Sequence, residues 1–135
     1  LGRAAIDEMA EGTKCGCHEG FPCDGDHCVN RVMLTECDSK TCNVGASKCN
    51  NRRIRNQVYP PVRVAVSEGK GHGLFARSRI GQGTLVQEYV GEVIGHEEWC
   101  VRIATYREGD PVYFFALGSL FIDASEFGSL ARFIN

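Results

Sequence analysis

The chain has 135 residues, a formal net charge of −2 at pH 7 and 43% hydrophobic residues. These values are typical of one or two small globular domains, and they exclude a chain that is basic throughout and binds nucleic acid by its overall charge. No apolar run approaches the length of a membrane span, and residues 1–12 contain no apolar stretch of the kind that directs secretion.

Seven of the eight cysteines lie in residues 15–49, with the spacing C-x-C-x5-C-x4-C-x8-C-x4-C-x6-C. Disulfides or a metal cluster could hold them. Cys15 and Cys17 are too close for an unstrained mutual disulfide but suit two ligands of one tetrahedral ion. The number is also odd, and two Zn²⁺ ions with four ligands each would need one bridging thiolate among seven. We therefore predict zinc, with His18 and His27 as surface loop residues rather than ligands.

The cysteine-rich part contains one predicted helix, at residues 28–36, and we expect metal binding to fold the rest. The amino-acid composition changes after about residue 56. Pro60 and Pro61 mark the domain boundary, because proline disfavours helical geometry in the residue before it and cannot donate to a β-ladder. The predicted division is an N-terminal segment at 1–14, a zinc-binding module at 15–57 and a second domain at 58–135.

The second domain has β-type periodicity. Segments rich in valine, isoleucine and aromatic residues predict short strands at 63–67, 72–76, 84–94, 112–117 and 120–123. Gly118 and Ser119 fit a two-residue hairpin turn between the last two. Residues 97–107 predict one inserted helix with Trp99, Ile103 and Tyr106 on one face, and residues 126–134 predict a final helical segment. The predicted fold class is mainly β.

Ordered motifs along the chain carry a resemblance to a known family. They are the cysteine string with its internal CVNRVMLTEC, followed by GKGHGLFA, IGQGTLVQEYVGEVI, YFFAL, IDAS and ARFIN. Over residues 15–135 the chain resembles the SET-domain protein lysine methyltransferases in which an AWS zinc module precedes the SET domain. The resemblance implies an irregular zinc-cluster module followed by a partial SET (β-clip) domain of short strands with one inserted helix. Because the sequence ends at Asn135, before the family's catalytic tyrosine and post-SET cysteines, we expect these 135 residues alone to be inactive.

The same resemblance implies the zinc ligands. One ion would be held by Cys15, Cys17, Cys23 and Cys28, and the other by Cys23, Cys37, Cys42 and Cys49. Cys23 would be the bridging thiolate. The cysteine count requires a bridge but does not say which residue it is.

The resemblance further implies a site for S-adenosylmethionine. Its residues would be Lys70, Gly71, His72, Tyr113 and Asn135. A glycine-rich turn alone is more often only a tight turn, so the surrounding motifs carry this interpretation. His72 departs from the tryptophan common in close relatives. The implied catalytic residues, which would line a narrow channel for the substrate lysine, are Tyr89, Tyr113 and Phe114.

The function implied is that of a histone-lysine N-methyltransferase with lysine 36 of histone H3 as its target, acting in the nucleus on chromatin. Its partners would be the histone H3 tail and the nucleosome, with no membrane. Arg52, Arg53 and Arg55 form a local basic run that could contact DNA phosphate, although a solvated surface is the safer interpretation. The alternative function is a zinc-stabilised chromatin-binding module or an inactive SET relative.

Overall fold

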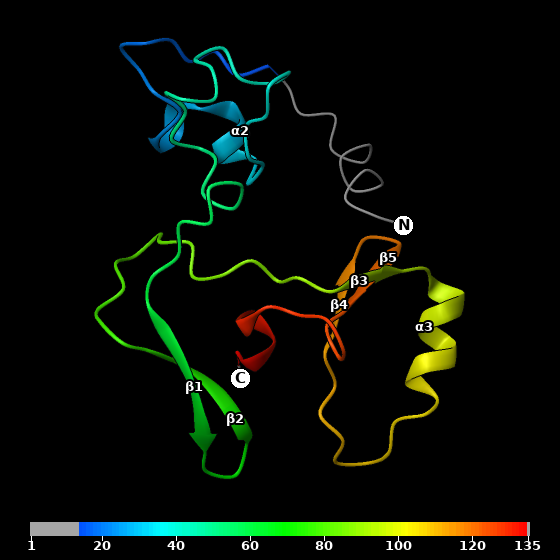
Figure 1. Cartoon of the computed structure of the whole chain (residues 1–135). Coiled ribbons are helices and arrows are strands. Elements are labelled where there is room, and N and C mark those ends of the chain that lie inside the picture. Colours follow the sequence, from blue (N-terminus) through cyan, green and yellow to red (C-terminus); the bar gives the residue numbers. More distant parts are fainter. Residues whose placement is uncertain (1–13, 135) are drawn as a thin grey trace. The chain divides into compact units, whose positions relative to one another are not determined.

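A computed structural model describes residues 14–134 (Figure 1). The chain forms two compact units, the first ending at Tyr59 and the second beginning at Pro60. Within the described residues, no helix combines the length and the apolar character needed to cross a membrane.

The first unit has little regular secondary structure over residues 14–59. It contains a 3₁₀ helix, η1 (Gly25–His27), and one turn of α-helix, α2 (Val29–Val32). The predicted helix at 28–36 is thus shorter than expected. It ends because Leu34 adopts a left-handed φ of 57°, and the Thr35 amide then donates to the Asn30 carbonyl at 2.8 Å.

The core of the first unit is made of cysteine side chains. Its buried residues are Cys15, Cys17, Cys23, Cys28, Cys37 and Cys49, with Cys42 and Val44 packed against them. Large apolar side chains lie outside this core, since Phe21, Met33 and Leu34 are all exposed. So small an apolar core cannot by itself offset the chain entropy lost on folding. The unit therefore depends on what the cysteines bind.

Leu34 is a position where a substitution should stabilise the first unit. Its side chain is 96% exposed, while a left-handed backbone costs a non-glycine L-residue roughly 1–2 kcal/mol. We expect Leu34→Gly to raise the free energy of unfolding by about 1 kcal/mol, measured by denaturant titration of the zinc-loaded protein. The control is Met33→Gly, because Met33 is also exposed but has an ordinary φ of −79°. An equal loss of stability in both variants would contradict the expectation.

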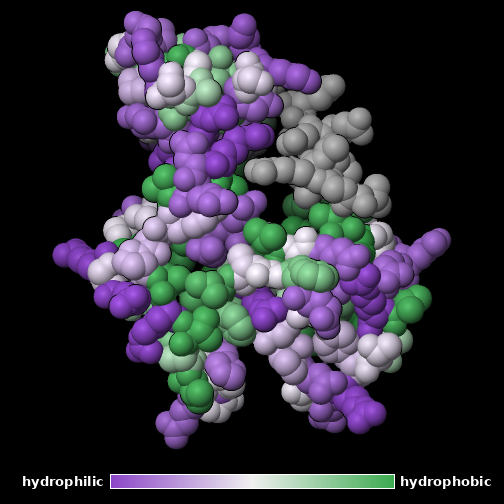
Figure 2. Space-filling view, in the orientation of Figure 1, coloured by the Kyte–Doolittle hydropathy of each residue, from purple (hydrophilic) through white to green (hydrophobic). Residues whose placement is uncertain are grey.

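The second unit contains two small antiparallel sheets. In the first, β1 (Val62–Ser67) pairs with β2 (Gly71–Ala76), with Val62 opposite Ala76 and Ser67 opposite Gly71. Hydrophobic residues gather along this hairpin on the face seen in Figure 2. Val66 of β1 is among the exposed apolar side chains. The second sheet has the order β3-β5-β4, with β5 (Leu120–Asp123) between β3 (Glu92–Ile94) and β4 (Phe114–Leu117).

Two helical segments complete this unit. α3 (His96–Ile103) follows β3, and a 3₁₀ helix, η2 (Leu130–Phe133), lies one residue before the end of the described chain. Ser129 caps η2, since its side-chain oxygen accepts a hydrogen bond from the Ala131 amide at 3.2 Å. These elements confirm the predicted fold class of short strands with one inserted helix.

Several predicted boundaries differ from the structure. The strand expected at 84–94 pairs only over Glu92–Ile94, and residues 84–91 run without ladder hydrogen bonds. The helices expected at 97–107 and 126–134 are found at His96–Ile103 and Leu130–Phe133. The hairpin turn at Gly118 and Ser119 is confirmed, and Gly118 has the positive φ of 59° that such a turn uses. Propensity alone places element types better than their ends, because pairing partners determine where a strand stops.

Candidate functional site

The sulfur atoms of the first unit lie at separations suited to a metal cluster. There are two sets of four thiols, and within each set all four sulfur atoms lie within 4.8 Å of one another. The sets are Cys15, Cys17, Cys23 and Cys28, and Cys15, Cys23, Cys37 and Cys42. The Cys15–Cys23 and Cys23–Cys42 sulfurs are each 3.8 Å apart. Tetrahedral zinc with Zn–S distances of about 2.3 Å places its sulfurs about 3.8 Å apart, whereas a disulfide bond is about 2.05 Å. The cluster can therefore bind zinc.

Cys23 belongs to both sets of four, as a bridging thiolate must. The first set is the predicted ligand set of one ion. The second set contains Cys15 where the prediction has Cys49. Cys49 is nevertheless buried, and its thiol interacts with the thiols of Cys42 and Cys23. The choice between Cys15 and Cys49 for the second ion stays a prediction.

Burial makes these thiols hard to ionise without a cation nearby. It raises the pKa of Cys17 to about 11 and that of Cys49 to about 12, and it raises the pKa of Cys23 still further. Burial also acts to raise the pKa of Cys15, but hydrogen bonds from the Asn43 and Cys17 amides and from the Cys23 and Cys17 thiols together outweigh it and bring the value to about 7. A divalent cation favours thiolates throughout such a cluster, because its charge compensates theirs.

Amide groups surround the cluster and would orient its ligands. The buried Asn30 side chain donates to the Cys37 sulfur at 3.4 Å and to the Thr41 carbonyl at 3.3 Å. The Asn51 side chain donates to the Thr35 carbonyl at 2.8 Å, and its nitrogen lies 3.6 Å from the same sulfur. Such outer hydrogen bonds hold metal ligands in place. Sequence reasoning missed both asparagines, because nothing in their spacing separates them from loop residues.

The second unit contains a cavity of about 570 Å³, formed by three chain segments. The segments are the turn leading into β2, the loop before β4, and η2 with the residue after it. The lining residues are Gly69, Lys70, Gly71, His72, Gly109, Pro111, Val112, Tyr113, Arg132 and Ile134. The cavity thus brings together four of the five predicted cofactor-binding residues. Asn135, the fifth, lies outside the described residues.

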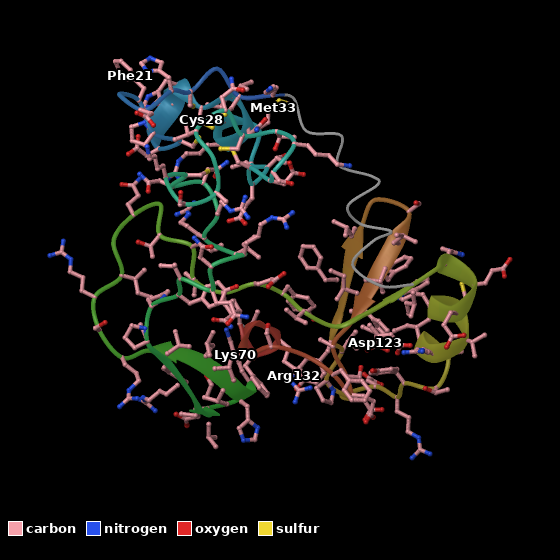
Figure 3. The ribbon with its side chains drawn as sticks, turned by 45° about the horizontal axis from the view of Figure 1, so that its top comes forward. Phe21, Cys28, Met33, Lys70, Asp123 and Arg132 are labelled. Atoms are coloured by element: carbon pink, nitrogen blue, oxygen red, sulfur yellow. The ribbon has the colours of Figure 1, made fainter. Side chains whose placement is uncertain are left out.

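The cavity wall carries aromatic rings and positively charged side chains. The Arg132 guanidinium lies 5.3 Å from the Tyr113 ring centre and 4.9 Å from that of Phe133. The His72 ring lies 6.2 Å from that of Phe133. Figure 3 labels the two cations of the wall, Lys70 and Arg132, which come from the β1–β2 turn and from η2. Arg132 was not among the predicted site residues, because no sequence pattern indicates that η2 returns to the glycine turn.

The residues predicted to line a lysine channel separate into two groups. The Tyr89 hydroxyl donates to the Tyr113 carbonyl at 2.8 Å, and its ring lies 5.3 Å from that of Phe115. Burial raises the pKa of Tyr89, and the charge of Asp123 adds to this shift. Phe114 instead has its ring 5.6 Å from that of Tyr106. Neighbouring strand residues point to opposite sides, so the alternation from Tyr113 to Phe115 could have identified Phe115 from the sequence.

Comparisons with known proteins agree with this architecture. The AWS domain family matches residues 12–57, and the SET domain family matches residues 71–135. The chain is 35% identical over 133 residues to the histone-lysine N-methyltransferase, H3 lysine-36 specific, of Debaryomyces hansenii, covering 90% of this chain and 18% of that protein. It is 37% identical over 114 residues to the human histone-lysine N-methyltransferase SETD2, covering 82% of this chain and 4% of that protein.

A solved structure is similar over most of the chain. It is ctPRC2 in an autoinhibited conformation bound to S-adenosylmethionine, with a TM-score of 0.76 and 28% identity, covering 91% of this chain and 19% of that chain. The chain thus spans less than a fifth of the length of each of these proteins. The cysteine cluster falls within the matched AWS residues, and the cavity falls almost wholly within the matched SET residues. The chain therefore belongs to the SET-domain family, with an AWS domain preceding its SET-domain residues.

Proposed function

We propose that this chain is part of a histone-lysine N-methyltransferase that uses S-adenosylmethionine and modifies lysine 36 of histone H3. The observation that carries the proposal is the single cavity that unites Lys70, Gly71, His72 and Tyr113. Relatives named as H3 lysine-36 specific enzymes, at 35% identity in one case, support the target. The nucleus, and chromatin within it, is the corresponding location.

S-adenosylmethionine, when bound, supplies a methyl group on a positively charged sulfur. The chain's own residues would bind and orient it. Gly69 and Gly71 both have a φ of 72°, which a side chain would strain, and the absence of Cβ atoms lets the backbone approach a ligand. The Tyr113 ring offers an aromatic wall that suits a cationic ligand. Asn135 remains a proposed member of this site.

The substrate side of the site is proposed to be an aromatic channel lined by Tyr89, Tyr113 and Phe114, with Phe115 added on the evidence of its contact with Tyr89. Methyl transfer to nitrogen needs an unprotonated amine in line with the donor. An aromatic channel excludes water, and this disfavours the charged ammonium form of the lysine. Its narrow walls also fix the angle at which the amine approaches the donor.

The AWS module, proposed at residues 15–57 ahead of the SET residues at 58–135, would serve a structural role. Two zinc ions held by Cys15, Cys17, Cys23, Cys28, Cys37, Cys42 and Cys49 would fold it without taking part in catalysis. Beside the cluster, Arg52 and Arg53 are half-buried and Arg55 is exposed. We propose that they contact nucleosomal DNA while the SET residues engage the histone H3 tail.

The proposal is tested on the intact protein that carries this chain. Calorimetry should detect one molecule of S-adenosylmethionine bound per chain. Methyl transfer should occur to a histone H3 peptide, and not to a control peptide in which lysine 36 is replaced by arginine. Failure to bind the cofactor would contradict the proposal. Zinc and histone binding without cofactor binding would favour an inactive chromatin-binding relative.

A further inference from the structure

Arg102 of α3 forms ion pairs with three carboxylates. Its Nη1 atom donates to Glu92 at 2.7 Å and to Asp123 at 2.8 Å, and its Nε atom donates to Glu98 at 2.7 Å. Asp123, labelled in Figure 3, is buried, whereas Glu92 is exposed. Arg102 therefore connects α3 to both β3 and β5.

Two of these carboxylates oppose each other. Glu92 of β3 lies directly across the antiparallel pair from Asp123 of β5. Like charges at opposed strand positions destabilise a sheet. The Arg102 guanidinium, which donates to both, replaces this repulsion with two ion pairs. The hydrogen bond from Arg102 correspondingly lowers the pKa of Glu92.

The peptide groups that follow Asp123 hold the residues of the site. The Ala124 amide donates to the Tyr113 carbonyl at 3.0 Å, and this oxygen also accepts the Tyr89 hydroxyl at 2.8 Å. The carbonyls of Ala124 and Ser125 both accept from Arg132, at 2.8 Å and 3.0 Å. Asp123 Oδ1 fixes this turn by accepting the Ser125 amide at 2.9 Å. One turn thus positions the cavity wall and the proposed channel together.

We propose that Arg102 is a positioning residue for methyl transfer: by pairing with Glu92 and Asp123 it holds the end of β5 where Ala124 and Ser125 fix Tyr113, Tyr89 and Arg132. The inference rests on the proposed function, since it concerns how the cofactor and substrate sites are kept aligned. Arg102 does not line the cavity. Its effect on cofactor binding therefore passes through the strand end.

Three variants of the intact protein test this role. Arg102→Gln removes the cation, Arg102→Lys keeps a charge that cannot make the same forked contacts, and Glu92→Gln combined with Arg102→Gln removes one opposed carboxylate as well. Arg79→Gln is the matched control, because Arg79 is an exposed arginine of the same unit that does not line the cavity. Calorimetry gives the dissociation constant of S-adenosylmethionine, steady-state kinetics separates its KM from kcat, and thermal melting reports folding.

Arg102→Gln is expected to weaken cofactor binding about tenfold and to raise KM by a similar factor, measured well below its melting temperature. Arg102→Lys and the double variant should each recover part of the affinity. Arg79→Gln should bind like the wild type. The double variant restores no contact between α3 and the strands. If it nevertheless recovers affinity, Arg102 acts by positioning the end of β5 and not by stabilising the unit in general.

Unchanged affinity in a folded Arg102→Gln variant would overturn the inference. If that variant does not fold, wild-type affinity in Arg102→Lys would overturn it instead. A wild-type protein that binds no S-adenosylmethionine would refute the proposed function. This result is distinct from the two above, in which the wild type binds the cofactor and a variant binds it equally well.

Discussion

The Cys23→Ser variant is expected to lose zinc from both sites and to unfold the first unit. Cys23 is fully buried and belongs to both sets of four thiols, so its replacement removes a ligand from each ion. Zinc binding is coupled to folding in small metal-dependent units, at apparent free energies of roughly 10–16 kcal/mol. The core of this unit is made of cysteines, and its described residues offer no alternative apolar core that could compensate. Elemental analysis should find two zinc ions per wild-type chain and fewer than one in the variant.

Cys100→Ser is the matched control for this experiment. Cys100 is exposed on α3 and lies outside both sets of thiols. This variant should keep two zinc ions and an unchanged circular dichroism spectrum. A folded, zinc-loaded Cys23→Ser protein would show that another residue bridges the ions. Metal-free protein with its thiols oxidised in pairs would contradict the zinc cluster altogether.

The Gly91→Ala variant is expected to destabilise the second unit by about 3 kcal/mol. A Cβ atom at position 91 would lie 2.3 Å from the Asp123 carbonyl oxygen and 2.8 Å from the Ile122 Cγ2 atom. The first of these is backbone, so the contact can be relieved only by moving β3 away from β5. Denaturant titration of the wild type and the variant gives the difference in the free energy of unfolding.

Gly95→Ala is the control for Gly91→Ala. It lies at the start of α3, has a φ of −80°, and no heavy atom lies within 4 Å of its would-be Cβ atom. Gly95 is the N-cap of α3, where alanine is less favourable than glycine, so its replacement should cost no more than about 1 kcal/mol. A folded Gly91→Ala variant should also bind S-adenosylmethionine more weakly than the control, because Tyr89 precedes this contact by two residues. Equal stability of the two glycine variants would contradict the close approach of β3 and β5.

The metal cluster and the glycine turn were predictable because their residues are close together in the sequence. The seven cysteines lie within 35 residues, and a local spacing rule decides between zinc and disulfides. The turn at Gly118 is likewise a local property, and the structure confirms it. Element ends were less predictable. Residues 84–91 have the composition of a strand, but they pair with no other strand in the described part of the chain.

The AWS and SET character of the chain could be predicted from the amino-acid sequence, as could the thiols of the cluster and four described residues of the cavity. Two features could be known only from the folded structure: Arg132 lines that cavity, and Arg102 pairs with two opposed carboxylates. These contacts join residues on different elements, and they depend on which strand is central and which side each residue faces. Such contacts arise only when the sheet β3-β5-β4 assembles, because local propensity carries no information about distant partners.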